Sequence, residues 1–154
     1  MTITQRSALM IIFIVSLLTI VGAFLFQWAG YAPCPLCLMQ RWAYYAAIPL
    51  SLVFAGIARS NAGAARWGLL LLALILIANS IFGIYHAGAE WKFWPGPDTC
   101  GGALGDGLPN LTNDPVVRCD EAAIRILGLS LAGWNAVICA ALAAIALKGA
   151  SRHG

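Results

Sequence analysis

Charged residues are scarce in this chain. Of its 154 residues only 10% are Asp, Glu, Lys or Arg, whereas 61% are hydrophobic, and the mean hydropathy is +0.83. Soluble domains carry about 25% charged residues and about 45–50% apolar ones. The deficit of charge leaves too little polar surface for a water-soluble fold, so the composition indicates an integral membrane protein.

Four apolar runs are long enough to cross the hydrocarbon core of a bilayer as helices, which takes roughly 20 residues each. The second run carries Pro49, a kink that a membrane helix tolerates. We therefore predict an all-α, polytopic membrane protein: a four-transmembrane-helix bundle forming one domain over residues 1–154. The predicted transmembrane helices cover about residues 7–29, 42–58, 67–85 and 127–147.

The first run lacks the marks of a cleaved signal peptide. Its apolar stretch exceeds the roughly 7–15 residues of a signal h-region, and no A-x-A cleavage site follows it. It does not end in a lipoprotein cleavage box either, because Pro33 precedes Cys34. We expect this run to remain as a transmembrane helix.

Acidic residues are absent from every part of the chain except the third connection. All 6 of them lie between Glu90 and Glu121. Basic residues instead accompany the N-terminus, the second connection and the C-terminus, and cytoplasmic loops carry an excess of Lys and Arg. We predict that both termini are cytoplasmic and that the connections over about residues 30–41 and 87–126 share the outer face. The basic residues behind this prediction are Arg6, Arg59, Arg66, Lys148 and Arg152.

The long outer connection, residues 87–126, differs from the rest of the chain. It is rich in proline and glycine, and loops of this length are usually functional or disordered. Near its end the stretch "RCDEAAIRIL" has helical spacing of its apolar residues. This spacing predicts a short interfacial helix leading into the fourth transmembrane helix.

Five cysteines are present, and four of them fall in the outer connections. The fifth, Cys139, lies inside the fourth predicted helix, where we expect it to pack as a small hydrophobic residue. Extracytoplasmic spaces are oxidising, and four outer cysteines allow three pairings. The short C-x-x-C spacing favours Cys34–Cys37, which leaves Cys100–Cys119.

The C-x-x-C spacing favours exchange chemistry over a structural role. Closing so short a loop removes little chain entropy, whereas a C-x-x-C pair lets one thiolate attack and its neighbour resolve. For Cys100–Cys119 a purely structural bond remains an equal alternative. A four-thiolate zinc site is disfavoured, because structural zinc takes two close-spaced pairs and no histidine stands beside Cys100 or Cys119. No metal site is predicted.

Arg41 and His86 are two charged or titratable side chains that could act together with this motif. If a helix begins near Cys37, Arg41 lies one turn further along the same face. The helix N-terminus and the guanidinium would then lower the pKa of the Cys37 thiol, and a guanidinium fork also suits a carbonyl oxygen. A snorkelling interfacial arginine is the alternative. His86 ends the third predicted helix and is either a proton shuttle for this site or a plain interfacial histidine.

Two cysteine pairs at one membrane surface suggest an electron relay. The glycines after Cys100 would let that pair meet a soluble dithiol and then the pair beside Cys37. The sequence holds no ligand set for haem or an iron–sulfur cluster. Electrons reaching Cys37 therefore require a diffusible, lipid-soluble acceptor, and a quinone is our hypothesis.

With these features in place, the chain resembles the disulfide bond formation protein B (DsbB) family along nearly its whole length. The resemblance is carried by four helices and by "CPLCLMQR", "YHAGAEWKFWPGPDTC" and "RCDEAAIRILGLSLAGWN". Members are inner-membrane oxidases that recharge the periplasmic thiol oxidase DsbA. The resemblance implies a protein-disulfide:quinone oxidoreductase of the bacterial inner membrane. Its implied partners are a DsbA-like protein, membrane lipid and a quinone, ubiquinone or menaquinone; no nucleic-acid partner is expected.

The resemblance also implies roles for individual residues. Cys34–Cys37 would be the quinone-linked disulfide, with Cys37 nearest the ring and Arg41 in the quinone site. Cys100–Cys119 would be the shuttle pair, with Cys100 forming the mixed disulfide with the soluble partner.

Two details set this chain apart within the family pattern. Gln40 stands where some members have a glutamate before the arginine, and the stretch between the two loop cysteines is shorter than in some. His86 matches a histidine that members often carry near the end of the third helix, which implies a place near the quinone.

Two alternatives remain open at this point. The vitamin K epoxide reductase family also contains four-helix, quinone-linked thiol oxidases, but there the loop cysteines precede the C-x-x-C motif. A non-enzymatic membrane scaffold with two bracing disulfides is the second alternative.

Overall fold

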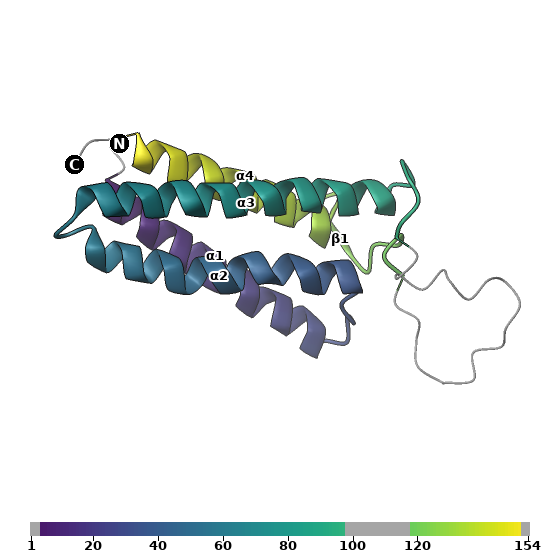
Figure 1. Ribbon diagram of the computed structural model, residues 1–154. Coiled ribbons are helices and arrows are strands. Elements are labelled where there is room, and N and C mark those ends of the chain that lie inside the picture. The colour runs from purple at the N-terminus through teal and green to yellow at the C-terminus, as the bar shows by residue number, and fades with distance from the viewer. Residues whose placement is uncertain (1–3, 98–117, 152–154) are drawn as a thin grey trace, which may run out of the picture.

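The computed structural model describes residues 4–97 and 118–151. Four helices make up the described fold: α1 (Gln5–Trp28), α2 (Pro35–Ile57), α3 (Ala62–Glu90) and α4 (Leu131–Ala150). Successive helices run in opposite directions, so α1 begins and α4 ends at the same end of the bundle (Figure 1). The predicted all-α bundle of four helices is confirmed.

Three of the four helices, α1, α3 and α4, are long and apolar enough to cross a membrane by their own composition. The helix α2 has 23 residues but is not among them. Its first turns carry Gln40 and Arg41, which lower its hydropathy and whose side chains are buried against the other helices. Helix α2 packs against α1 and α3, and a transmembrane helix over residues 42–58 stays a prediction.

Helix α2 begins earlier than the apolar run suggested. Cys34 is its N-cap, with its Sγ accepting the backbone N–H of Cys37, and Pro35 occupies the first helical position. Both are favourable ways to start a helix, because the first N–H groups have no partner within the helix. The C-x-x-C motif is therefore part of the first turn of α2 rather than of a loop. Helix α3 likewise extends past residue 85 and ends at Glu90.

The segment before α4 contradicts one expectation. The predicted interfacial helix is wrong: after a series of bends the chain forms a small antiparallel hairpin, β1 (Arg125–Ile126) and β2 (Leu129–Ser130). Its two-residue turn, Leu127 and Gly128, has positive φ angles of 51° and 84°, as a type I′ hairpin requires. The helical spacing was real, but Gly128 favours the turn, so α4 starts at Leu131 instead of about residue 127.

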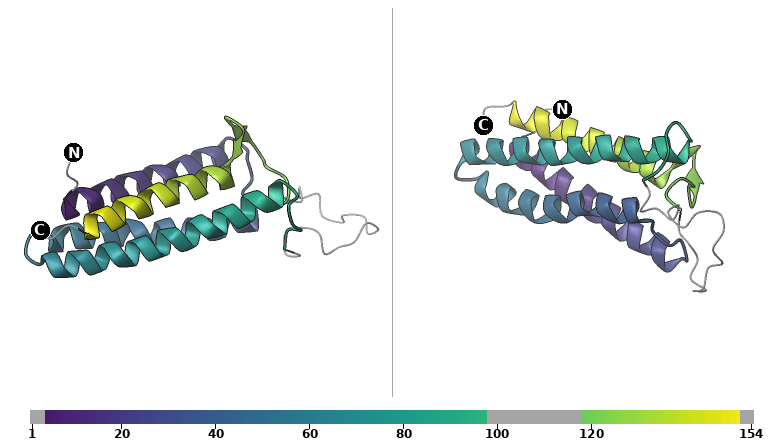
Figure 2. Two further views of the ribbon diagram at one scale, coloured as in Figure 1. Left: turned by 90° about the horizontal axis from the view of Figure 1, so that it is seen from above. Right: turned by 45° about the vertical axis from the view of Figure 1, so that its right-hand side comes forward.

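Small residues let α3 and α4 pack closely, and this pair makes the most extensive contact in the bundle. The two helices lie side by side in both views of Figure 2. At Gly83, a Cβ atom would lie 3.1 Å from the backbone nitrogen of Ala136, so glycine is what permits this approach. Leucines and isoleucines fill the rest of the core, including Leu9, Ile12, Leu69, Leu72, Leu76 and Leu142.

The predicted long outer loop falls largely outside the described residues. The described parts of it are the stretch after α3 up to Pro97 and the stretch from Arg118 to the hairpin. Both lie at the end of the bundle where α2 begins (Figure 1).

Candidate functional site

A thiol pair occupies the first turn of α2. The Sγ atoms of Cys34 and Cys37 lie 2.9 Å apart, and both cysteines carry free thiols. The Cys34 side chain is buried, with 4% of its surface exposed, because Leu36 and Cys119 pack against it. The backbone N–H of Cys37 also points at the Cys34 sulfur, at 3.2 Å. The fold thus holds two thiols at a distance from which little movement is needed to form a disulfide.

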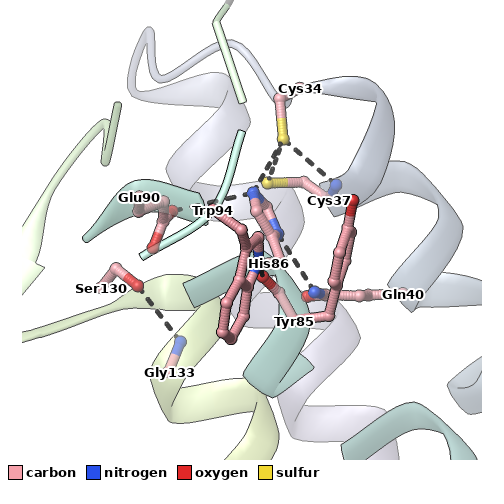
Figure 3. A network of polar contacts seen from close by, with 9 residues as sticks. All are labelled: Cys34, Cys37, Gln40, Tyr85, His86, Glu90, Trp94, Ser130 and Gly133. Atoms are coloured by element: carbon pink, nitrogen blue, oxygen red, sulfur yellow. Dashed lines mark hydrogen bonds and ion pairs between the residues drawn. The ribbon is translucent and has the colours of Figure 1, made fainter. Parts of the chain in front are cut away.

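His86 projects from α3 into this thiol pair (Figure 3). Its Nε2 lies 3.5 Å from the Cys34 sulfur, and its Nδ1 lies 3.1 Å from Nε2 of Gln40. With the Gln40 amide donating to Nδ1, the ring carries its hydrogen on Nε2 and directs it toward Cys34. The histidine is 1% exposed. The structure therefore brings His86 together with the cysteines of the C-x-x-C motif.

Glu90 lies in the same cluster as His86 and the two thiols, although in the sequence it stands out only as one of the acidic residues of the third connection. One of its oxygens, Oε1, lies 3.7 Å from Nε2 of His86. The two residues are four positions apart on α3 and so share a helix face. That spacing was the only signal in the sequence, and it becomes informative only once α3 is known to continue to residue 90.

The pKa values of the two thiols shift in opposite directions, and not as the sequence predicted. The pKa of the Cys34 thiol is lowered, first because the Cys37 thiol hydrogen-bonds to the ionised sulfur and further because His86 faces it. The pKa of Cys37 is raised, first because its thiol is the partner of Cys34. The prediction of a lowered pKa at Cys37 is therefore wrong. The N-terminal N–H group of α2 that was expected to favour the Cys37 thiolate points back at Cys34 instead.

Arg41 is held by α1 rather than by the thiols. Its guanidinium donates to Oε1 of Gln27 at 2.9 Å and to the backbone oxygen of Ala23 at 3.4 Å. The same group lies over the ring of Phe24, 5.1 Å from its centre. This buried cation is fixed between α1 and α2 with N–H groups to spare, since a guanidinium has five.

An apolar cavity of about 400 Å³ opens beside these residues. It lies between α1, α2, α4 and the hairpin, and most of its wall is aliphatic or aromatic. Cys37 and Arg41 both line it, whereas Cys34 does not. The other polar side chains in its wall include Gln40, Tyr44 and Asn135. A cavity of this size and polarity is typical of a small-molecule site.

The deep polar wall of this cavity continues into a network between α2, α3 and α4. The hydroxyl of Tyr44 donates to Oδ1 of Asn135 at 2.6 Å, and Nδ2 of Asn79 lies 3.3 Å from the Cys139 sulfur. Tyr44 and Cys139 are themselves 3.2 Å apart. Cys139 is fully buried, so it packs as expected but also joins three helices through polar contacts.

A second cavity, of about 230 Å³, lies on another side of the thiol pair. Cys34 and Cys37 both line it, together with the acidic residues Glu90 and Glu121 and the basic residue Arg118. It is smaller and more polar than the first cavity. Cys37 thus lines both the apolar and the charged cavity, whereas Cys34 lines only the charged one.

Cys119 approaches the thiol pair from the segment before the hairpin. It is fully buried, in one cluster with Cys34 and Leu36, and it is disulfide-bonded. Cys100, the partner expected from the sequence, lies outside the described residues. Asp120 next to it pairs with Lys92 and Arg118, and these two cations hold the pKa of its carboxyl group below the usual range. The ion pair of Asp120 with Lys92 fastens the Cys119 segment to the residues that follow α3.

Together, the fold and the site define a helical membrane protein with a thiol pair and a disulfide-bonded cysteine packed at one end of its bundle. The chain belongs to the DsbB family: the family model described as "Disulfide bond formation protein DsbB" matches residues 5–148. Membership makes it a disulfide-forming membrane protein. With the three spanning helices, it also indicates a multi-pass protein of the inner membrane.

Individual relatives agree with this assignment. Disulfide bond formation protein B of Pseudomonas syringae pv. tomato is 33% identical over 141 residues, covering 84% of this chain and 80% of that protein. The protein of the same name from Azoarcus sp. is 30% identical over 136 residues, covering 82% of this chain and 80% of that protein. An uncharacterized protein of Rickettsia prowazekii is 26% identical over 116 residues, and the match spans 65% of its length. No solved structure matches the chain significantly.

Proposed function

We propose that this protein oxidises the thiols of a DsbA-like periplasmic protein and passes the electrons through its two cysteine pairs to a membrane quinone, ubiquinone or menaquinone. One observation carries the proposal: the thiol pair has two different faces. Cys34 packs against the disulfide-bonded Cys119, while Cys37 shares the wall of the apolar cavity with Arg41. Such a pair receives electrons on one side and releases them on the other.

The apolar cavity fits a quinone head group. Its volume of about 400 Å³ and its aliphatic wall suit a planar, lipid-soluble ring. A quinone has two carbonyl oxygens, and Arg41 offers a fixed cation to one of them. Tyr44 and Asn135 provide polar atoms elsewhere in the wall. When bound, the quinone would accept two electrons and two protons.

Each step on the protein is a thiol–disulfide exchange that balances. The partner's two thiols reduce the Cys100–Cys119 disulfide and leave as a disulfide, transferring two electrons and two protons. The reduced pair then attacks the Cys34–Cys37 disulfide. Because Cys119 packs against Cys34, we place this attack at the Cys34 sulfur: Cys119 forms a mixed disulfide with Cys34 and releases Cys37 as the thiolate. The Cys100 thiol then attacks Cys119 in this mixed disulfide, which restores the Cys100–Cys119 bond and releases Cys34 as the second thiol. Cys37 lines the apolar cavity, so a quinone held there would take up the two electrons and two protons released when Cys34 and Cys37 form their disulfide again.

We also place the cysteine-bearing end of the bundle in the periplasm and both termini in the cytoplasm. The start of α1 and the end of α4 lie at the end opposite the thiol pair (Figure 1). The excess of basic residues in the termini and in the α2–α3 connection supports this direction.

A turnover assay tests the proposal. Purified protein in detergent, supplied with ubiquinone or menaquinone, is expected to oxidise a reduced DsbA-like protein catalytically. Cys37→Ser should abolish turnover, because the last thiol of the relay is missing, whereas the matched control Cys139→Ser should retain it. Turnover that survives replacement of all four outer cysteines would refute the relay. A bracing scaffold would give no turnover with any variant.

A further inference from the structure

Reduction of the thiol pair creates a set of metal ligands at the centre of the site. One ligand atom each from Cys34, Cys37 and His86 lies within 4.8 Å of the others. Two thiolates and an imidazole are the ligands that Zn²⁺ prefers. This set differs from the four-cysteine zinc site that the sequence disfavours, because its histidine comes from a different helix, α3.

Glu90 is not part of this set of three, but it lies next to His86 and is the candidate for a fourth ligand. Its Oε1 is 3.7 Å from Nε2 of His86. Its other oxygen, Oε2, is buried and has no hydrogen-bond partner in the part of the chain that the structure describes. A buried carboxylate oxygen without a partner is costly. Here the unpaired oxygen belongs to a residue that is 8% exposed. Figure 3 shows Glu90 next to His86, which in turn faces the thiol pair.

The charged cavity gives an ion a way to reach these ligands. It is lined by Cys34, Cys37 and Glu90 and also by Glu121. Carboxylates along such a cavity raise the local concentration of cations. Arg118 in the same wall pairs with Glu121 at 3.8 Å and offsets its charge, which leaves the Glu90 carboxyl group nearest the thiols. Arg41 does not line this cavity, so an ion reaching the thiols from this side avoids that cation.

Gln40 allows His86 to act as a ligand. A metal bound at Nε2 requires the ring hydrogen on Nδ1, which must then be donated to an acceptor. Gln40 lies 3.1 Å from Nδ1, and half a turn of its amide replaces the donating nitrogen with the accepting oxygen. The same side chain therefore supports the histidine in both tautomers.

We propose that the reduced Cys34–Cys37 pair, together with His86 and Glu90, binds one Zn²⁺ ion and that the bound ion blocks reoxidation of the pair. Two Zn–S bonds, one Zn–N bond and one Zn–O bond form, both thiols release their protons to solvent, and no electron is transferred. Tetrahedral geometry with Zn–S bonds of about 2.3 Å separates the two sulfurs by about 3.8 Å. The thiols, now 2.9 Å apart, move apart by about 1 Å and cannot form a disulfide while the ion is present.

The binding is tested on the full chain in detergent without any quinone or partner protein. The protein is reduced, freed of reductant under anaerobic conditions and titrated with Zn²⁺ against a chromophoric chelator. We expect one tightly bound Zn²⁺ per reduced chain and none once Cys34 and Cys37 are oxidised. Absence of binding to the reduced chain, or equal binding to both forms, would overturn the proposal. This comparison needs no variant and does not depend on the proposed function.

Variants identify the ligands. His86→Ala and Glu90→Gln are each expected to weaken Zn²⁺ binding about tenfold or more, whereas Cys139→Ala, which removes a buried thiol elsewhere, leaves it unchanged. Cobalt(II) serves as a second probe: its thiolate charge-transfer absorption should persist in Glu90→Gln, which also shows that this variant is folded, and disappear in Cys34→Ser. Unaltered affinity in both His86→Ala and Glu90→Gln would refute the site.

The block on reoxidation rests on the proposed function and is measured separately. Zn²⁺ added to the turnover assay should slow oxidation of the dithiol partner, and a chelator should restore it. Turnover unaffected by a bound ion would refute the block while the binding site stands. Failure of the wild-type enzyme without zinc would instead refute the proposed function.

Discussion

The lowered pKa of Cys34 has a cause that two substitutions can isolate. Three groups face its sulfur: the Cys37 thiol at 2.9 Å, the Cys37 backbone N–H at 3.2 Å and Nε2 of His86 at 3.5 Å. The contribution of the Cys37 thiol is the largest. Cys37→Ser keeps a hydroxyl donor next to Cys34, whereas Cys37→Ala removes the donor and leaves the backbone N–H in place. Each variant also leaves Cys34 as the only thiol of the pair, so its titration is no longer coupled to that of a neighbour.

A hydrogen bond to a charged group contributes about 1.5–3 kcal/mol. One pKa unit corresponds to 1.36 kcal/mol, so loss of the donor should raise the pKa of Cys34 by about 1–2 units. The sign follows from the charge: the donor stabilises the thiolate, and removing it favours the protonated thiol. Adding His86→Ala to the Cys37→Ser background should produce a smaller rise, because its contact is longer.

The assay is the pH dependence of iodoacetamide alkylation at Cys34, followed by mass spectrometry so that Cys139 is not counted. The midpoint in Cys37→Ala should lie about 1–2 pH units above that in Cys37→Ser. Coincident midpoints would show that the Cys37 side chain does not stabilise the thiolate. A larger rise from His86→Ala than from removing the Cys37 donor would reverse the order of causes inferred from the structure.

Two further predictions concern the cavity wall and the helix packing. Arg41→Ala should raise the KM for quinone more than the KM for the dithiol partner, with Arg59→Ala as the matched control; an unchanged quinone KM would exclude Arg41 from the quinone site. Gly83→Ala should destabilise the bundle by about 1–3 kcal/mol through overpacking, because its Cβ would lie 3.0 Å from Nδ2 of Asn135. Gly22→Ala, with nothing within 4 Å of the new atom, is its control, and equal unfolding midpoints in denaturing detergent would contradict the packing.

Much of the fold follows from the sequence because hydropathy reports burial in lipid directly. The four apolar runs predicted the four helices, and the charge deficit predicted the class of protein. The helix ends were harder to predict, since caps depend on local geometry. Cys34 caps α2 through its sulfur. The sequence does not predict this role, because Ser, Thr, Asp and Asn are the usual N-cap residues.

The candidate site was only partly predictable, because its contacts join side chains from different helices. The sequence singled out Cys34, Cys37, Arg41 and His86, but it could not show which of them touch. Arg41 contacts α1 instead of a thiol, because its long side chain reaches across the helix interface. Glu90 joins the cluster through a helix that continues beyond its apolar stretch. Periodicity describes one helix at a time, whereas these contacts arise between helices.

The N-cap of α2 links the chemistry of the site to the mechanics of the helix. The sulfur that reacts is also the acceptor for the N–H of Cys37, one of the N–H groups in the first turn of α2 that have no partner within the helix. A thiolate is a stronger hydrogen-bond acceptor than a neutral disulfide sulfur, so the first helical turn is held more firmly when the pair is reduced. Amide hydrogen exchange at Cys37 is therefore expected to be slower in the reduced protein than in the oxidised one, which exchange followed by NMR or mass spectrometry would measure. The backbone of a single residue thereby reports the oxidation state of the centre without any label.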